Sequence, residues 1–176
     1  MMNEHGYSID EYASTEREVR ALLTALVRVV KPRLVVETGC YVGRGTEALV
    51  RGVIDNGFGR VVTCDTDHGM VARTVGHVGA LHAFNAPCEA RCCAGIDLPE
   101  LIDADLVFLD SDYANRYPEF ERVKPGAVVV AHDALRSYDA NVSPHEGWIR
   151  EVGGLVLGTY RGLGIIVKNY ARGQKR

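Results

Sequence analysis

Four short apolar runs constrain the fold of this chain more strongly than any other feature of its sequence. They read RLVVE, RVVTC, DLVFL and AVVVA, and they occupy Arg33–Glu37, Arg60–Cys64, Asp105–Leu109 and Ala127–Ala131. Polar and apolar residues do not alternate within them, so each run fits a strand buried on both faces, as in a mainly parallel sheet covered by helices. The sequence therefore predicts an α/β sandwich.

Helical patterns separate these runs. Thr15 and Glu18 have the spacing of a capping box, and the apolar residues that follow recur at helical spacing as far as Val30. A glycine-rich segment, Thr38–Gly45, leads from the first strand into a second helix, expected over Thr46–Asp55. Right-handed crossovers through such helices produce a doubly wound, Rossmann-like sandwich.

The C-terminal part of the chain has a different pattern. Leu155–Tyr160 and Leu163–Lys168 are joined by Arg161-Gly162 and predict an antiparallel hairpin that completes a mainly parallel, seven-stranded sheet. A chain of 176 residues that is 47% hydrophobic and 24% charged fits one domain with a substantial core. We expect a single domain over 1–176, with an N-terminal segment over 1–13, a core over 14–168 and a basic tail over 169–176.

Charge and composition argue against several classes of partner. Lys and Arg total 20 and Asp and Glu 23, and the formal net charge of −3 does not suit a nucleic-acid-binding module. No apolar run approaches the roughly 18 residues that span a bilayer, and the N-terminus lacks the pattern of a signal peptide. Five cysteines, an odd number, favour reduced thiols. We therefore expect a cytoplasmic protein without membrane contact, and the sequence leaves open whether it is a homo-oligomer.

Acidic residues follow the predicted strands at the ends where ligands bind in open α/β sheets. Glu37, Asp65, Asp110 and Asp133 each stand at or just beyond a strand end. A single carboxylate in such a place commonly caps a helix. Four around one crevice repel one another unless a cationic or hydroxyl-rich ligand lies among them. The sequence therefore predicts a ligand of that kind.

Two cofactor classes compete for this crevice. Gly43-x-Gly45-x-x-Ala48 matches the dinucleotide fingerprint, and Asp65 follows Gly45 by 20 residues, the spacing of a ribose-binding acid. That triplet begins six residues after Glu37, too late for the tight first turn, and a glutamate is poorly placed beside a pyrophosphate. S-adenosylmethionine has no phosphate; Glu37 would serve its cationic end while Asp65 accepts hydrogen bonds from both ribose hydroxyls. The electrostatics favour S-adenosylmethionine over NAD(P).

A family resemblance rests on three segments. VVETGCYVGRGT at Val35–Thr46 resembles the E-x-G-x-x-x-G-x-S/T first motif of class I S-adenosylmethionine-dependent methyltransferases. Asp105–Asp133, reading DLVFLDSDY…FERVKPGAVVVAHD, is similar to the D-x-x-F-I-D-x-D-H…L-K-P-G-G…H-D region of that family. Gly162–Val167 looks like its closing strand, and the resemblance covers about residues 14 to 168. The subgroup it resembles most comprises small metal-dependent O-methyltransferases and cephalosporin-hydroxylase-like proteins.

The resemblance implies which residues contact the cofactor. It places Glu37, Thr38, Gly39, Tyr41 and Gly43 at the methionine end, Asp65 and Thr66 at the ribose, Asp97 in the turn near the adenine, and Asp110 beneath the transferable methyl group.

The resemblance also implies a divalent cation that binds the acceptor hydroxyl. Asp110 and Asp133 match the metal ligands of the family, with Asp112 or His132 as a third ligand. Oxygen ligands of this kind suit Mg²⁺.

Two positions depart from the family pattern. Ala134 stands where the relatives have an asparagine ligand, and Tyr113 stands where they have a lysine or a histidine. The implied metal site is therefore weakened, changed or absent, and without a metal His132 or Tyr113 would act as general base. The predicted catalytic residues are Asp110, His132 and Asp133.

The expected function is S-adenosylmethionine-dependent methyl transfer (EC 2.1.1.-) to a small-molecule acceptor, through in-line attack by a hydroxyl oxygen. Two alternatives stay open: an NAD(P)-dependent Rossmann oxidoreductase, and a non-catalytic relative that still binds the cofactor. The sequence does not identify the acceptor.

Overall fold

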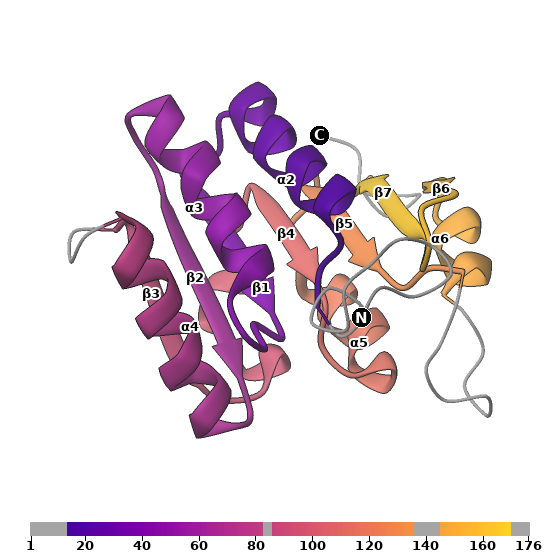
Figure 1. Ribbon diagram of the computed structural model, residues 1–176. Helices are drawn as coiled ribbons and strands as arrows, with labels where there is room; N and C mark the ends of the chain where they lie inside the picture. The colour runs from indigo at the N-terminus through magenta and orange to yellow at the C-terminus, as the bar shows by residue number, and fades with distance from the viewer. Residues whose placement is uncertain (1–13, 83–85, 136–144, 170–176) are drawn as a thin grey trace.

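A seven-stranded sheet organises the part of the chain that this computed structural model describes, residues 14–82, 86–135 and 145–169. Its strands are β1 (Leu34–Thr38), β2 (Arg60–Asp65), β3 (Cys88–Cys92), β4 (Leu106–Leu109), β5 (Val128–His132), β6 (Leu155–Leu157) and β7 (Leu163–Val167). They lie in the order β3-β2-β1-β4-β5-β7-β6 (Figure 1). β1 to β5 pair in parallel, whereas β7 is antiparallel to both β5 and β6.

Helices cover both faces of this sheet. They are α2 (Arg17–Val30), α3 (Arg44–Asn56), α4 (His68–His82), α5 (Tyr113–Arg122) and α6 (Glu146–Glu151), with two 3₁₀ turns, η1 (Gly95–Asp97) and η2 (Pro99–Ile102). α2, α3 and α4 contribute buried residues to one face. η2, α5 and α6 contribute buried residues to the other (Figure 1).

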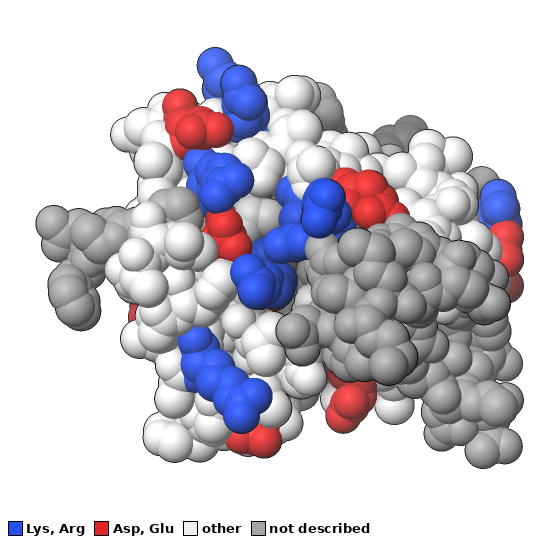
Figure 2. Space-filling model, in the orientation of Figure 1, with Lys and Arg blue, Asp and Glu red and all other residues white. Residues whose placement is uncertain are grey.

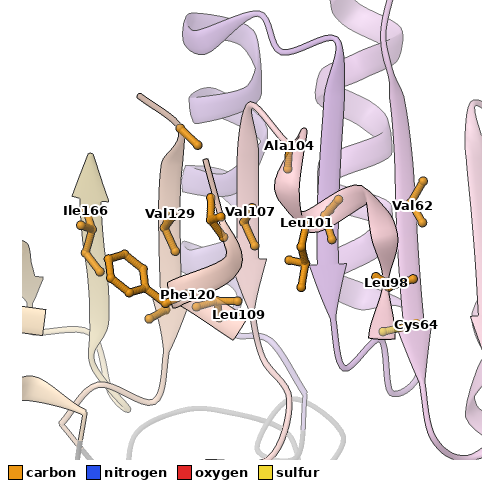
Figure 3. Close-up of a cluster of buried hydrophobic side chains, with 14 of the residues drawn as sticks. Val62, Cys64, Leu98, Leu101, Ala104, Val107, Leu109, Phe120, Val129 and Ile166 are labelled. Atoms are coloured by element: carbon orange, nitrogen blue, oxygen red, sulfur yellow. The ribbon is translucent and has the colours of Figure 1, made fainter. Parts of the chain in front are cut away.

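Two hydrophobic cores result, one on each face of the sheet. Successive residues of a strand point to opposite faces, so Val35 of β1 packs in the core under α2 and α3, while Val36 packs in the opposite core. Figure 3 shows the second core, where Phe120 of α5 lies against Leu109 and Val129 of the sheet. Burial on both sides explains why the central strands β1, β2, β4 and β5 are mostly apolar.

The predicted fold class is confirmed. The structure has the doubly wound, mainly parallel sheet and the antiparallel hairpin of β6 and β7. α4 runs through Gly76 and Gly79 without interruption, and a Cβ at either position would meet nothing within 4 Å.

One detail of the expected elements is wrong. Thr15 and Glu18 do not form a capping box: α2 begins after Glu16, and no side chain caps it by a hydrogen bond. Glu16 instead turns inward and is 1% exposed. In α5, which starts at Tyr113, Pro118 lies inside the helix.

None of the helices in the described ranges has the length and apolar character that crossing a membrane requires. The predicted N-terminal segment, residues 1–13, and residues 170–176 of the predicted tail lie outside the described residues. The single-domain boundaries therefore stay a prediction.

Candidate active site

A pocket of about 440 Å³ opens at the carboxyl ends of the parallel strands. Three groups of lining residues follow β1, β2 and β4: Gly39–Val42 with Arg44, Cys64–Asp67, and Asp110–Tyr113. Others come from the turn after β3 (Cys93–Gly95), from the end of β5 (Asp133) and from two arginines, Arg116 and Arg161. This is the position that the strand-end rule predicts for a ligand.

The loop after β1 forms one wall through its backbone. Gly39 has a φ of +83°, and the N–H groups of Gly39 and Cys40 both donate to the Cys64 carbonyl at 2.9 Å. A Cβ at Gly39 would stand 2.7 Å from the Asp110 carbonyl carbon and 2.8 Å from the Ser111 nitrogen. Glycine is therefore required here, because only the missing side chain lets this loop lie against the end of β4.

We expect Gly39→Ala to destabilise the protein by about 1–3 kcal/mol more than Gly57→Ala, the usual cost of overpacking. Both glycines have positive φ, +83° and +74°, but a Cβ at Gly57 would meet nothing within 4 Å. The comparison thus separates the backbone clash at Gly39 from the cost of positive φ. Urea denaturation of both variants measures the difference, and equal losses would show that the close approach at Gly39 is not tight.

Asp65 ends β2 with its carboxylate at the pocket. Oδ2 accepts a hydrogen bond from the Tyr41 N–H at 3.0 Å, and Oδ1 accepts one from the Asp67 N–H at 3.0 Å. Each carboxylate oxygen has two lone pairs, so both retain capacity for a ligand. Two oxygens fixed in this way suit a pair of adjacent hydroxyls.

Glu37 is not in the pocket. It is 1% exposed, and its Oε2 accepts hydrogen bonds from the hydroxyls of Thr46 and Thr63, the latter at 2.6 Å. Burial, opposed by these two hydrogen bonds, raises the pKa of its carboxyl to about 7. A Cβ at Gly45 would lie 2.5 Å from Glu37 Oε1, so the start of α3 packs closely against this carboxylate. The hydrogen bonds from Thr46 of α3 and Thr63 of β2 hold the helix start to the sheet beneath the loop.

A second buried carboxylate, Glu119 of α5, was missed by the sequence reasoning. Its Oε2 accepts hydrogen bonds from the hydroxyls of Thr38 and Ser111, both at 2.8 Å. Burial, only partly offset by these bonds, raises its pKa. Thr38 therefore points away from the pocket and joins β1 to α5.

Six charged residues form a cluster at the other end of the pocket, which we call the charge cluster: Glu16, Asp110, Arg116, His132, Asp133 and Arg161. His132 lies at its centre and is fully buried. Its Nδ1 is 2.9 Å from Asp110 Oδ1, and its Nε2 is 2.6 Å from Glu16 Oε2.

Both ring nitrogens of His132 donate, because ionised carboxylates can only accept. Burial alone would lower the pKa of the imidazole, but Asp110, Glu16 and Asp133 outweigh it and raise the pKa to about 9. Burial likewise opposes ionisation of Glu16, yet its bonds to His132 and Arg161 lower its pKa to about 2. The pair is therefore an imidazolium and a carboxylate.

Two arginines complete the charge cluster. Arg116 donates to the carbonyls of Ser111 at 2.6 Å and His132 at 2.5 Å, and its Nη2 lies 3.4 Å from Asp110 Oδ1 and 3.3 Å from Asp133 Oδ2.

Arg161 lies on the other side of the cluster, between Glu16 and Asp133. Its Nε donates to Glu16 Oε1 at 2.9 Å and lies 3.2 Å from Asp133 Oδ1. Its Nη2 donates to the Ser14 carbonyl at 2.7 Å. Asp133 has a φ of +53°, and among the described residues its buried Oδ1 has no hydrogen-bond partner.

The comparisons with known proteins agree with this architecture. No protein-family model matches the chain. A curated relative named "Putative O-methyltransferase", from Mycobacterium sp. (strain JLS), is 29% identical over 152 residues, which cover 78% of this chain and 67% of the relative. The O-methyltransferase from Bacillus cereus, solved in complex with SAH, superimposes with a TM-score of 0.72 at 21% identity, covering 86% of this chain and 81% of the other. The fold is that of the class I S-adenosylmethionine-dependent methyltransferases.

A further solved methyltransferase supports this assignment. TomG, an O-methyltransferase from Streptomyces achromogenes solved in complex with SAM, has a TM-score of 0.66 at 18% identity, covering 89% of this chain and 82% of the other. The family resemblance predicted from the sequence is confirmed.

The methyltransferase fold brings only some of the predicted residues to the pocket. Six predicted site residues line it: Gly39, Tyr41, Asp65, Thr66, Asp110 and Asp133. Five others do not: Glu37, Thr38, Gly43, Asp97 and His132. In the turn expected near the adenine, Ala94 and Gly95 reach the pocket while Asp97 lies beyond it.

The implied metal ligands also meet in this fold. Ligand atoms of Asp110, His132 and Asp133 all lie within 4.8 Å of one another. Those atoms already face cations, however, because Arg116 contacts both aspartates and Arg161 contacts Asp133. The donor set therefore does not fit a divalent cation well, since the counter-charge that the acidic strand ends require is supplied by the chain itself.

Proposed function

We propose that this protein transfers a methyl group from S-adenosylmethionine to a hydroxyl oxygen of a small molecule. The observation that carries the proposal is the pocket itself, in which the Gly39 backbone and the Asp65 carboxylate face the same space at the carboxyl ends of β1 and β2. The similarity to O-methyltransferases supports the same reaction.

The residues present fit S-adenosylmethionine. Asp65 would bind the ribose hydroxyls, the Gly39–Tyr41 backbone would lie along the methionine part, and Ala94 and Gly95 would flank the adenine. When bound, the cofactor supplies a sulfonium methyl group, whose carbon–sulfur electron pair stays on sulfur as the acceptor oxygen bonds the carbon. Glu37 would not contact the cofactor; its hydrogen bonds to Thr46 and Thr63 would hold the glycine loop and α3 in place.

Asp133 would receive the acceptor. Asp133 lines the pocket, and its buried Oδ1 has an ion-pair contact with Arg161 at 3.2 Å but no hydrogen-bond partner among the described residues, so an acceptor O–H that reaches this carboxylate can donate to it. The carboxylate would take that proton as the oxygen attacks. His132 is not placed for this role, because both its nitrogens are engaged and it does not line the pocket.

A small-molecule acceptor suits the size of the pocket. On the face shown in Figure 2, Lys and Arg side chains are interspersed with Asp and Glu, which supports a small molecule rather than a nucleic acid as the partner. A cytoplasmic location and the oligomeric state stay predictions.

Cofactor binding gives the test. Asp65→Ala should weaken binding of S-adenosylhomocysteine by about 1.5–3 kcal/mol, roughly 10- to 150-fold, because it removes a charged hydrogen-bond acceptor. Isothermal titration calorimetry measures this loss. Asp55→Ala, an exposed carboxylate paired with Arg28 at the end of α3, is the matched control and should bind normally.

The same titration with NADPH separates the alternative function. We expect the wild-type protein to bind S-adenosylhomocysteine and to show no comparable affinity for NADPH. Tight NADPH binding, or unchanged affinity for S-adenosylhomocysteine in Asp65→Ala, would contradict the proposed function.

A further inference from the structure

The charge cluster is balanced within the chain. Its three carboxylates, Glu16, Asp110 and Asp133, face three cations, Arg116, His132 and Arg161. His132 counts as a cation because a carboxylate accepts from each of its ring nitrogens. Desolvated carboxylates need compensating charge, and here each one has at least two cationic neighbours.

The carboxylate oxygens that a metal would use already face cationic groups. Asp110 Oδ1 lies 2.9 Å from His132 Nδ1 and 3.4 Å from Arg116 Nη2. Asp133 Oδ2 lies 3.3 Å from Arg116 Nη2, and Asp133 Oδ1 lies 3.2 Å from Arg161 Nε. A divalent cation among these atoms would be in close repulsion with two guanidinium groups and an imidazolium.

Moving either arginine out of the charge cluster would be energetically unfavourable. Arg116 is 3% exposed and satisfies the carbonyls of Ser111 and His132, while Arg161 is 6% exposed and satisfies the Ser14 carbonyl and the Glu16 carboxylate. Displacing either one would leave buried acceptors without donors, which costs more than a surface ion pair gains. The arginines are therefore built into the site.

We infer that Arg116 and Arg161 take the place of a divalent cation at this site, and that the protein binds its acceptor without a metal ion. The inference rests on the proposed function, because it concerns the acceptor end of the same pocket. The two arginines are positioning residues: they fix Asp110 and Asp133 and neutralise them, as a metal would. Asp133 is then held at the pocket by ion pairs with the two arginines rather than by coordination to a metal.

Manganese binding tests this inference without requiring a known acceptor. Wild-type protein loaded with S-adenosylhomocysteine is titrated with Mn²⁺, and electron paramagnetic resonance measures the free ion. We expect no saturable binding at millimolar Mn²⁺. Saturable binding by the wild type that disappears in Asp133→Asn would overturn the inference.

A second variant tests whether Arg116 occupies the place of a divalent cation. Arg116→Met keeps most of the side-chain volume but removes the charge, so the two aspartates should gain affinity for Mn²⁺. Arg150→Met, which breaks only an exposed ion pair with Glu146, should bind no Mn²⁺. If folded Arg116→Met shows no gain, the arginine does not occupy the place of a cation. If that variant does not fold, the wild-type titration decides alone.

Calorimetry with S-adenosylhomocysteine on the same samples distinguishes a failure of the proposed function from a failure of the inference that the site is metal-free. A protein that binds neither S-adenosylhomocysteine nor Mn²⁺ contradicts the proposed function. A protein that binds S-adenosylhomocysteine and also binds Mn²⁺ through Asp133 contradicts only the inference of a metal-free site.

Discussion

Glu16→Gln is expected to lower the free energy of unfolding by about 3–5 kcal/mol, the usual cost of removing one partner from a buried ion pair. Glu16 is 1% exposed and accepts from both His132 and Arg161. A glutamine keeps the shape, but its amide N–H₂ would face two buried cations, and the three cations of the charge cluster would then share only two carboxylates, Asp110 and Asp133.

Urea denaturation of Glu16→Gln and of Glu18→Gln measures this effect. Glu18 is exposed in the first turn of the same helix, so its substitution should cost at most about 1 kcal/mol, the usual range for a surface ion pair. Similar losses in the two variants would show that Glu16 acts only through the helix dipole and that the buried pairs contribute nothing.

The pH dependence of stability should change in the same variant. The pKa of Glu16 is lowered from 4.5 to about 2, so its contribution is present above pH 4.5 and is lost as the pH falls toward 2. The pKa of His132 is raised from 6.5 to about 9, so its contribution is present below pH 6.5 and is lost as the pH rises through 9. Glu16→Gln should therefore remove part of the acid-induced loss, which unfolding curves between pH 2 and pH 7 would reveal.

The parts of the fold that could be predicted are those that depend on local pattern. Apolar runs predicted β1, β2, β4 and β5, because burial on both faces favours apolar side chains in either direction along the strand. The strand-end rule then located the pocket at the carboxyl ends of the parallel strands, where Asp65, Asp110 and Asp133 line it.

Side-chain direction at the end of β1 could not be predicted in this way. Glu37 shares the strand face of Val35, which packs under α2 and α3, so its carboxylate points into that layer instead of past the strand end. Thr38 points to the other face and meets Glu119. Which helix covers which face is a tertiary property, and the spacing of residues in one strand does not contain it.

The charge cluster was also beyond the reach of sequence patterns. Glu16 and Arg161 are separated by 145 residues, and Glu16 and His132 by 116. An acidic residue near the start of a helix interacts favourably with the helix dipole, so the pattern around Glu16 indicated only a helix start and not its burial. The need for positive charge at the acidic strand ends was predictable, but its source within the chain, Arg116 and Arg161, was not.

Asp133→Asn should lower the rate of methyl transfer by about 10²- to 10⁴-fold, the usual contribution of a general base. The substitution keeps the shape of the side chain, but an amide cannot take the proton of the acceptor hydroxyl. Affinity for S-adenosylhomocysteine should change little, because Asp133 lies at the opposite end of the pocket from Asp65. Release of S-adenosylhomocysteine during turnover with a panel of phenols and alcohols measures the rate, and calorimetry measures the affinity.

Asp112→Asn is the matched control for this loss. Asp112 also lines the pocket, but it lies outside the charge cluster, so its substitution removes one negative charge without removing the proposed base. A fall in rate confined to Asp133→Asn would support proton transfer to Asp133. Full activity of Asp133→Asn would contradict that role. Tyr113, which also lines the pocket, would then be the remaining predicted base, because both nitrogens of His132 are engaged by carboxylates.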